Sequence, residues 1–428
     1  MNMKNFILKG DICFSRSKEE LSCVEQGYLV CTDGICRGVF REIPQAYAGL
    51  SVQNWEHAMI LPGLYDLHVH APQYAFAGTG MDLELLKWLE TRTFPEEERY
   101  ADPEYARKAY GLFARKLKES ATVRACIFGT IHREATQILM EELEKTGLKT
   151  MVGKVSMDRN ASAGLLEPGP FAAARSVCQW LDGVSGKYEN VKPVVTPRFV
   201  PACTEELLGE LGKICEERKL PVQSHLSENP SEIAWVKELC PWAESYAEVY
   251  EHFGLLGMPE APAVMAHCVY SGESENEKKL LRENPVYIAH CPQSNTDLSS
   301  GIAPVRRYLE EGMLVGLGTD IAGGHKMSVF QTMAEAIQVS KLRWRLADDS
   351  LAPLRTEETF YLGTKGGGSF FGKVGSFEPG YELDAVIIDE ERLSTPARLS
   401  MKERLERIIY LSEDRDVVGK YVAGEKIF

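Results

Sequence analysis

Histidine and aspartate side chains stand at the ends of several short apolar runs in this 428-residue sequence. The first run ends in Asp66-Leu67-His68-Val69-His70, and because residues two apart in a strand share a face, His68 and His70 point the same way. Four further side chains close later runs, namely His225, His267, His290 and Asp320. Imidazole nitrogens with one carboxylate are a suitable ligand set for Zn²⁺ or Fe²⁺. A catalytic ion of this kind lowers the pKa of a bound water toward about 7, which makes hydroxide available.

The positions of these residues indicate a metal only when they are taken together. A single His-x-His pair in a strand, or one histidine at a strand end, is more often a packing or surface feature. The joint placement of His68, His70, His225 and Asp320 at the ends of strands of one barrel predicts that these four are the metal ligands. His267 is predicted to be either a further ligand or a catalytic group beside the metal water.

The remaining histidines are given other roles. His290 is expected to support the site from outside the ligand set. His132 closes the second run and begins an H-x-E motif over residues 132–134, as in zinc deaminases of the cytidine class. Those enzymes also need a P-C-x-x-C motif, which this sequence lacks. Structural or surface positions are expected for His57, His252 and His325.

Eight apolar runs, separated by stretches of helical pattern, must position these side chains. Most runs are rich in Val, Ile and Ala without clean alternation, which is typical of parallel strands buried on both faces. The runs cover residues 59–70, 122–132, 149–157, 191–200, 220–228, 261–269, 285–292 and 313–320. Eight strands alternating with helices predict an α/β fold with a TIM-like (β/α)₈ barrel. Such barrels carry their chemistry at the C-terminal ends of the strands, where the reactive side chains lie.

The two ends of the chain have a different texture. Residues 1–58 contain short β-like pieces with turn signals such as Asp33-Gly34, and residues 373–428 return to this pattern. We therefore expect a small β-sandwich domain built from residues 1–58 and 373–428, and a hydrolase barrel over residues 59–372.

Composition narrows the classes of partner. The net charge of −14 argues against nucleic acid or anionic membrane as the main partner, because both select basic surfaces. No stretch approaches the roughly 18 apolar residues of a membrane span. The 11 cysteines are scattered without a C-x-x-C pair, which favours free thiols in the reducing cytoplasm.

The residues described so far carry a resemblance to a known family. Leu61-Pro62-Gly63-Leu64-Tyr65-Asp66-Leu67-His68-Val69-His70, Ser224-His225-Leu226-Ser227-Glu228 and Gly318-Thr319-Asp320 resemble the amidohydrolase superfamily. Within it, the loop of residues 70–80, the segment 82–95 and the stretch Thr196-Pro197-Arg198-Phe199 are similar to the branch that deaminates guanine to xanthine. Residues 266–270 and 323–327 differ from the pattern of that branch, so the exact substrate specificity stays open.

The resemblance implies a role for each matching position. His68, His70, His225 and Asp320 would hold one zinc ion. Contacts to the purine would come from Gln73, Arg198, Phe199 and Glu228. As catalytic groups, Glu228 would move protons to the ring, Asp320 would accept the water proton and His267 would stabilise the reacting oxygen. The resemblance also implies a homodimer. Arg198 at the end of the fourth strand, where two-metal relatives have a modified lysine, favours a single metal; Lys154 and Lys192 lie earlier in their runs and are expected to be structural.

Other readings remain open from the residues alone. The substrate could be another aminated heterocycle, such as an oxidised purine, a pterin or a triazine. A barrel kept only for binding, or a two-metal amide hydrolase, is less consistent with Glu228 and Arg198. The loop 71–100 is expected to form a short helix after Asp82, with Leu83, Leu86, Trp88 and Leu89 partly buried, and to serve as a lid or as a subunit contact.

Overall fold

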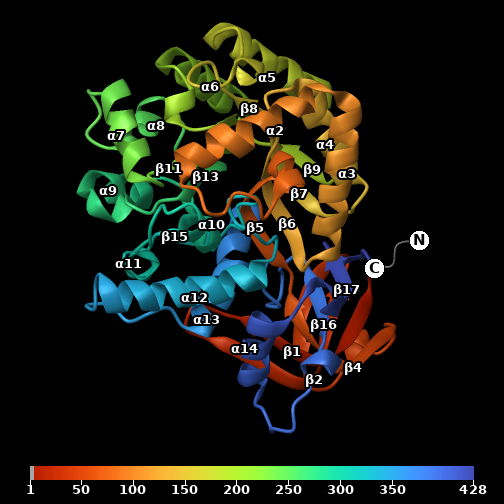
Figure 1. The fold of residues 1–428 in the computed structure, drawn as a ribbon. Coiled ribbons are helices and arrows are strands. Elements are labelled where there is room, and N and C mark those ends of the chain that lie inside the picture. The colour runs from red at the N-terminus through yellow and green to blue at the C-terminus, as the bar shows by residue number, and fades with distance from the viewer. Residues whose placement is uncertain (1–3) are drawn as a thin grey trace.

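A ring of parallel strands forms the upper body in Figure 1, in a computed structural model that describes residues 4–428. Its strands are β5 (Leu64–His70), β6 (Thr122–Phe128), β7 (Lys149–Gly153) with β8 (Val155–Ser156), β9 (Val191–Pro193) with β10 (Thr196–Pro197), β11 (Val222–Leu226), β13 (Ala261–His267), β14 (Val286–His290) and β15 (Leu314–Leu317). Their ladders are parallel throughout. Every residue of β5 and β6 is buried, as the absence of alternation in their sequences predicts.

Backbone hydrogen bonds join the pieces of this sheet into a closed barrel. Val195 forms a parallel bridge to Val222, which links the fourth strand to the fifth. The segment after β15 returns to β5, where Asp320 N donates to His68 O at 2.8 Å and His70 N donates to Ile321 O at 3.1 Å. The predicted (β/α)₈ architecture is therefore confirmed, and its closing contacts lie among the candidate metal ligands.

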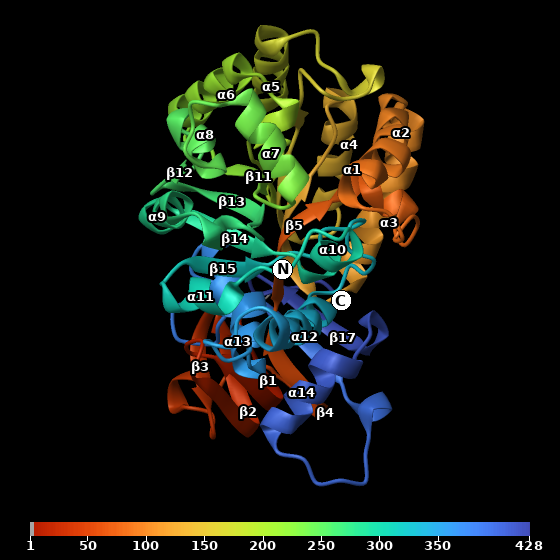
Figure 2. The same ribbon diagram turned by 60° about the vertical axis from the view of Figure 1, so that its left-hand side comes forward.

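Helices follow the strands and cover the outside of the barrel (Figure 2). They are α3 (Pro103–Glu119), α4 (Arg133–Glu144), α5 (Pro170–Val184), α6 (Glu205–Arg218), α7 (Pro230–Leu239), α8 (Tyr246–His252), α9 (Glu275–Glu283), α10 (Pro292–Asp297), α11 (Val305–Glu310), α12 (Val329–Leu346) and α13 (Thr356–Tyr361). Several begin at sequence-readable caps: the Thr204 side chain accepts from Leu207 N at the start of α6, for example. Within residues 4–428, none of the helices combines the length and the apolar character needed to cross a membrane.

The two chain ends form a second body, the red and blue segments at the bottom of Figure 1. Its single sheet has the order β18-β17-β16-β4-β1-β2-β3. The bounds are β1 (Phe6–Ser15), β2 (Leu21–Thr32), β3 (Ile35–Phe40), β4 (Val52–Pro62), β16 (Ala385–Asp389), β17 (Val417–Val422) and β18 (Glu425–Lys426), and helix α14 (Met401–Leu411) precedes β17. The sheet curls until Ile35 bridges Glu382 beside β16, so that one sheet encloses the core that a sandwich would place between two.

The apolar run 59–70 divides at Gly63 instead of forming one strand. Residues up to Pro62 pair with β1 and β16 of the small sheet, and Leu64 begins the barrel. Gly63 N donates to Asp384 O at 3.1 Å, and a Cβ on Gly63 would lie 2.3 Å from Val123 Cγ2. Only a residue without a side chain fits where the chain crosses between the two bodies. The periodicity of the sequence alone does not reveal this division of the run.

The segment between β5 and α3 folds over the open end of the barrel. It contains η2 (Ala71–Phe76), α1 (Leu85–Trp88), η3 (Leu89–Thr93), α2 (Phe94–Glu98) and η4 (Arg99–Ala101). The short helix expected after Asp82 is present. The expected burial of Leu86 is wrong, because its side chain is 37% exposed and Leu85 turns inward in its place.

Candidate active site

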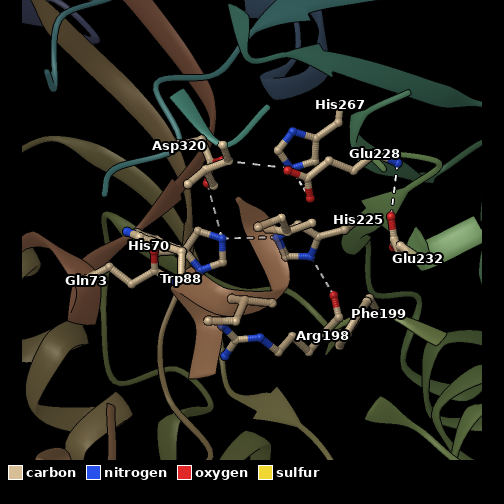
Figure 3. Close-up of a pocket in the computed structure, with 13 residues that line it drawn as sticks. His70, Gln73, Trp88, Arg198, Phe199, His225, Glu228, Glu232, His267 and Asp320 are labelled. Atoms are coloured by element: carbon tan, nitrogen blue, oxygen red, sulfur yellow. Dashed lines mark hydrogen bonds and ion pairs between the residues drawn. The ribbon is translucent and has the colours of Figure 1, made fainter. Parts of the chain in front are cut away.

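Five side chains from four strand ends converge at the mouth of the barrel. His70 Nε2 lies 3.1 Å from His225 Nε2, and Asp320 Oδ1 lies 3.1 Å from His68 Nε2 and 3.4 Å from His70 Nε2. His267 completes the group, with its Nε2 3.8 Å from Asp320 Oδ2. Figure 3 shows four of these side chains turned toward one another. Three imidazoles, His68, His70 and His225, form one set of potential metal ligands, and His68, His267 and Asp320 form a second, overlapping set.

The chemistry of this donor set fits a bound cation. Burial lowers the pKa values of His68, His70 and His225, so their rings are neutral and carry a lone pair. Two neutral Nε2 atoms at 3.1 Å can share at most one proton. Within residues 4–428, His68 Nε2 and His267 Nε2 are buried without a hydrogen-bond partner. The imidazole lone pairs converge beside the carboxylate of Asp320, and this is the donor set that a divalent metal ion requires.

Hydrogen bonds behind the rings fix which nitrogen faces the cluster. His225 Nδ1 lies 2.6 Å from the carbonyl oxygen of Arg198, and His267 Nδ1 lies 2.9 Å from Asn295 Oδ1. A carbonyl oxygen can only accept, so the Arg198 contact places the proton of His225 on Nδ1. Its Nε2 lone pair then points into the cluster, and the same assignment suits His267.

Asp66 holds the first and last strands in register beneath the cluster. Its carboxylate accepts from the backbone N–H groups of His68 and Thr319, at 3.2 and 3.0 Å, and from the Thr319 hydroxyl. Burial raises the pKa of Asp66 to about 6. At the strand ends, His267 (φ 71°) and Asp320 (φ 46°) adopt left-handed backbone conformations, which are sparsely populated and concentrate at functional sites. Burial opposes ionisation of Asp320, but His68 and the other imidazoles hold its pKa below the ordinary value.

Two buried glutamates lie beside the cluster. Glu228 Oε2 is 3.5 Å from His267 Nε2, and Glu228 Oε1 accepts from Ser300 Oγ at 3.1 Å. Burial, together with the charge of Asp320, raises the pKa of Glu228 to about 8. Glu232 Oε2 accepts from the backbone N–H of Glu228 at 3.0 Å, and burial raises its pKa to about 7. Glu228 can therefore carry a proton at neutral pH, close to the candidate metal position.

A cavity lies beside the cluster of candidate metal ligands. Apolar groups from α1 and η3 cover it, and Arg198, Phe199 and Gln73 form part of its wall (Figure 3). Its lining residues are His70, Gln73, Leu85, Trp88, Leu89, Arg198, Phe199, His225, Glu228, Glu232, His267, Leu298 and Asp320. An apolar cavity with a few convergent polar groups is typical of a small-molecule site. It brings candidate metal ligands, a proton carrier and hydrogen-bond donors together in one cavity.

Comparison with known proteins agrees with this arrangement. Residues 59–427 match the sequence profile of the Amidohydrolase family. The chain belongs to the amidohydrolase family. It is similar to guanine deaminase from Dictyostelium discoideum, with 40% identity over 385 residues that cover 88% of this chain and 84% of that protein. It is also similar to guanine deaminase from Escherichia coli (strain K12), with 34% identity over 89% of this chain and 85% of that protein.

A solved structure extends the similarity to the whole fold. Guanine deaminase from C. acetobutylicum, with guanine bound in its active site, superposes with a TM-score of 0.95 and 43% identity, covering 99% of this chain and 100% of that chain. The triazine hydrolase from Arthobacter aurescens has a TM-score of 0.84 at 16% identity, which shows a shared fold only. The similarity to guanine deaminases over most of its length shows that this chain is an enzyme that hydrolyses C–N bonds.

The structure of this amidohydrolase places the remaining predicted residues as follows. His290 ends β14, buried and outside the cavity lining, and burial lowers its pKa to about 3. His132 does not close a strand, because β6 ends at Phe128 and His132 directly precedes α4. Phe128 takes the strand-end position instead, with its ring 4.9 Å from that of His68. The three histidines expected at structural or surface positions, His57, His252 and His325, are all exposed.

Three further expectations concern lysine and cysteine side chains. Lys154 is buried and donates to Glu167 Oε1 at 2.8 Å, while Lys192 is exposed. Within residues 4–428, neither lysine lines the cavity beside the metal-ligand cluster. All eleven cysteines are free thiols, as expected.

Sequence reasoning missed two buried acids at this site. Glu232 follows Asn229 by three residues, a capping-box signal that indicates the start of α7 but no role beside Glu228. Glu97 lies in the run Glu96-Glu97-Glu98, where nothing distinguishes the middle residue until the helix turns it inward to 1% exposure. It pairs with Arg198, whose guanidinium binds a protein carboxylate as well as facing the cavity.

Proposed function

We propose that this protein is a zinc-dependent deaminase that hydrolyses guanine to xanthine and ammonia. The observation that carries this proposal is a cavity that brings together the imidazole and carboxylate cluster, the proton-bearing Glu228 and the donors of Arg198 and Gln73. Support comes from relatives named guanine deaminase at 34–40% identity and from the guanine-bound structure described above. The activity belongs to the breakdown or salvage of purines.

We assign one zinc ion per chain to His68, His70, His225 and Asp320. Bound there, Zn²⁺ would lower the pKa of a water molecule toward about 7 and so supply the nucleophile. The hydrogen bond from His225 Nδ1 to the Arg198 carbonyl keeps the Nε2 lone pair directed at the ion. Asp66 holds the strand ends that carry His68 and Asp320.

The side chains around the cavity divide the remaining work. Phe199, Arg198 and Gln73 hold the purine so that its C2 amine faces the metal cluster. Asp320 takes the proton of the attacking water. Glu228, protonated at neutral pH, delivers its proton to the ring nitrogen next to C2. A proton from the new hydroxyl group at C2 then passes through Glu228 to the leaving amine, and the proton held by Asp320 returns to Glu228 to complete the cycle. His267 directs its Nε2 at the reacting oxygen, and Leu85, Trp88 and Leu89 exclude bulk water.

The test is absorbance-monitored turnover of guanine by purified protein, with zinc content measured on the same sample. We expect xanthine and ammonia in equal amounts and about one zinc per chain. Zinc without guanine turnover would contradict the proposed substrate; other aminated heterocycles would then be screened, beginning with oxidised purines, pterins and triazines. Two metals per chain would contradict the single-metal assignment, and iron in place of zinc would correct the metal.

We also propose a cellular compartment and an oligomeric state. Eleven free thiols suit the reducing cytoplasm, which we propose as the compartment. A homodimer stays a prediction from the family resemblance, and light scattering after size-exclusion chromatography measures it directly.

A further inference from the structure

Glu97 forms a buried ion pair behind the wall of the cavity. Arg198 Nη1 donates to Glu97 Oε2 at 2.6 Å and Arg198 Nη2 donates to Glu97 Oε1 at 3.2 Å, a bidentate contact. Gln73 Nε2 donates to the same carboxylate at 3.1 Å. Arg198 and Gln73 line the cavity and Glu97 does not, although all three are at most 3% exposed. Glu97 therefore touches two candidate substrate contacts without facing the substrate.

This network leaves the amide of Gln73 only one orientation. A carboxylate paired with arginine accepts hydrogen bonds and cannot donate, so the NH₂ group of Gln73 must face Glu97. The opposite end agrees, since Gln73 Oε1 accepts from Ala322 N at 3.2 Å. The amide oxygen is thereby engaged by the backbone of Ala322. What Gln73 retains for the cavity is its second N–H.

The guanidinium of Arg198 is fixed in the same way. Two of its five N–H groups are used by Glu97, which leaves further donors and no acceptor. The ring of Phe94, at the start of the helix that carries Glu97, lies 5.5 Å from the guanidinium carbon and limits its rotation. In Figure 3, Arg198 and Gln73 lie on one side of the cavity and Glu228 and Glu232 on the other. The side away from the proton carrier therefore presents donors only.

We propose that Glu97 is a positioning residue that sets this donor-only wall and thereby selects purines with an oxo group at C6. The inference rests on the proposed function. Guanine presents acceptors at O6 and N7, whereas a 6-amino purine presents a donor at C6. A donor-only wall pairs with the first and leaves an unpaired donor against the second. A site built to hydrogen-bond one group discriminates strongly against an analogue that lacks it.

The experiment compares guanine with 2-aminopurine, which has the same amine at C2 but no oxygen at C6. Glu97→Gln removes the charge, keeps the shape and allows the amide at position 97 to face either way. We expect kcat/KM for guanine to fall roughly 10- to 100-fold, mainly through KM, because charge-assisted hydrogen bonds are lost. The value for 2-aminopurine should change less than about 3-fold by the same reasoning. Glu98→Gln removes one charge from the same helix and should leave the preference for guanine unchanged.

Equal losses on both substrates, with the guanine preference retained, would overturn the inference and make Glu97 a structural residue only. Loss of its counterion can also unfold the protein, so Glu97→Asp is the second variant. It keeps the charge but withdraws the carboxylate by one methylene, and it should reduce the guanine preference in the same direction. An unchanged preference in a folded Glu97→Asp protein would overturn the inference as well.

Failure of the proposed function gives a different pattern. Wild-type protein that does not deaminate guanine refutes the substrate, whatever the variants do. The wall is then tested by equilibrium binding of hypoxanthine, which has the 6-oxo group, against purine, which lacks it. Tighter binding of hypoxanthine by wild type, lost in Glu97→Asp, would still support the assignment of Glu97. Equal affinity of wild type for the two ligands would refute it.

Discussion

Replacement of Glu228 by glutamine should lower the catalytic rate but raise the stability of the metal-free protein. The side chain is 4% exposed, and glutamine keeps its volume and can still accept from Ser300 Oγ. It cannot exchange a proton, so kcat should fall by roughly 10²- to 10⁴-fold, the usual contribution of a positioned acid or base. Zinc content should not change, because none of the four proposed ligands is altered.

The stability effect follows from the pKa of Glu228. Burial raises this pKa from 4.5 to about 8, so the folded state holds a proton that the unfolded chain releases between these pH values. The free energy of unfolding of the metal-free protein therefore decreases as pH rises through this window. At pH 7 the accumulated penalty is about 3 kcal/mol, at 1.36 kcal/mol per pKa unit. Glu228→Gln removes that penalty and should stabilise the metal-free protein by up to this amount.

The assay is urea unfolding of chelator-treated protein between pH 5 and 8, with guanine turnover and zinc content measured on the metal-loaded samples. Glu283→Gln, an exposed residue of α9, is the matched control and should change neither quantity. The stabilising effect should be small at pH 5 and grow toward pH 8. Near-wild-type turnover would remove Glu228 from its proposed role, and a destabilised variant at pH 7 would refute the reasoning about its buried charge.

Three further predictions concern other parts of the molecule. Lys154→Met leaves Glu167 buried without its partner and should lower the free energy of unfolding by about 3–5 kcal/mol, while turnover per folded molecule, measured on the same samples, stays within a factor of two or so. A loss of turnover without a loss of stability would instead make Lys154 catalytic. Chelation should abolish turnover and lower the melting temperature, and added Zn²⁺ should restore both, because a ligand that binds only the folded state stabilises it. Gly63→Val should destabilise by at least about 1–3 kcal/mol in urea unfolding, since its Cβ would lie 2.3 Å from Val123 Cγ2; an unaffected variant would show that the crossing between the two bodies is not tightly packed.

Features set by local periodicity could be predicted from the sequence. The eight strands follow from apolar runs, and the placement of His68, His225 and Asp320 at one end of the barrel follows because parallel strands present their C-terminal ends together. The exposed position of Leu86 was not predicted, because the chain turns from α1 directly into the wider turn of η3 and places Leu85 inward instead. The boundary between the small sheet and the barrel could not be predicted either, because the apolar run 59–70 divides at Gly63 without a sequence signal.

Features that depend on partners far away in the sequence could not be predicted. Glu97 pairs with Arg198, which lies 101 residues later in the sequence, and the charge of Asp320 helps to raise the pKa of Glu228 although the two residues follow different strands. The sequence indicates that acids are present near the site. Which of them is ionised, and therefore what each can do, depends on the groups that the fold brings beside it.

Three buried acids of this site illustrate the point. Glu97 lies against a guanidinium, Asp320 lies among imidazoles that hold its pKa low, and burial together with the charge of Asp320 raises the pKa of Glu228 to about 8. The same substitution to glutamine should therefore act with opposite signs. At position 228 it removes a carboxyl group that must take up a proton on folding, whereas at position 97 it leaves Arg198 buried without its counterion, a loss of about 3–5 kcal/mol. Metal-free Glu228→Gln and Glu97→Gln proteins, unfolded side by side at pH 7, should fall on either side of wild type, although Glu97 and Glu228 are equally hidden from solvent.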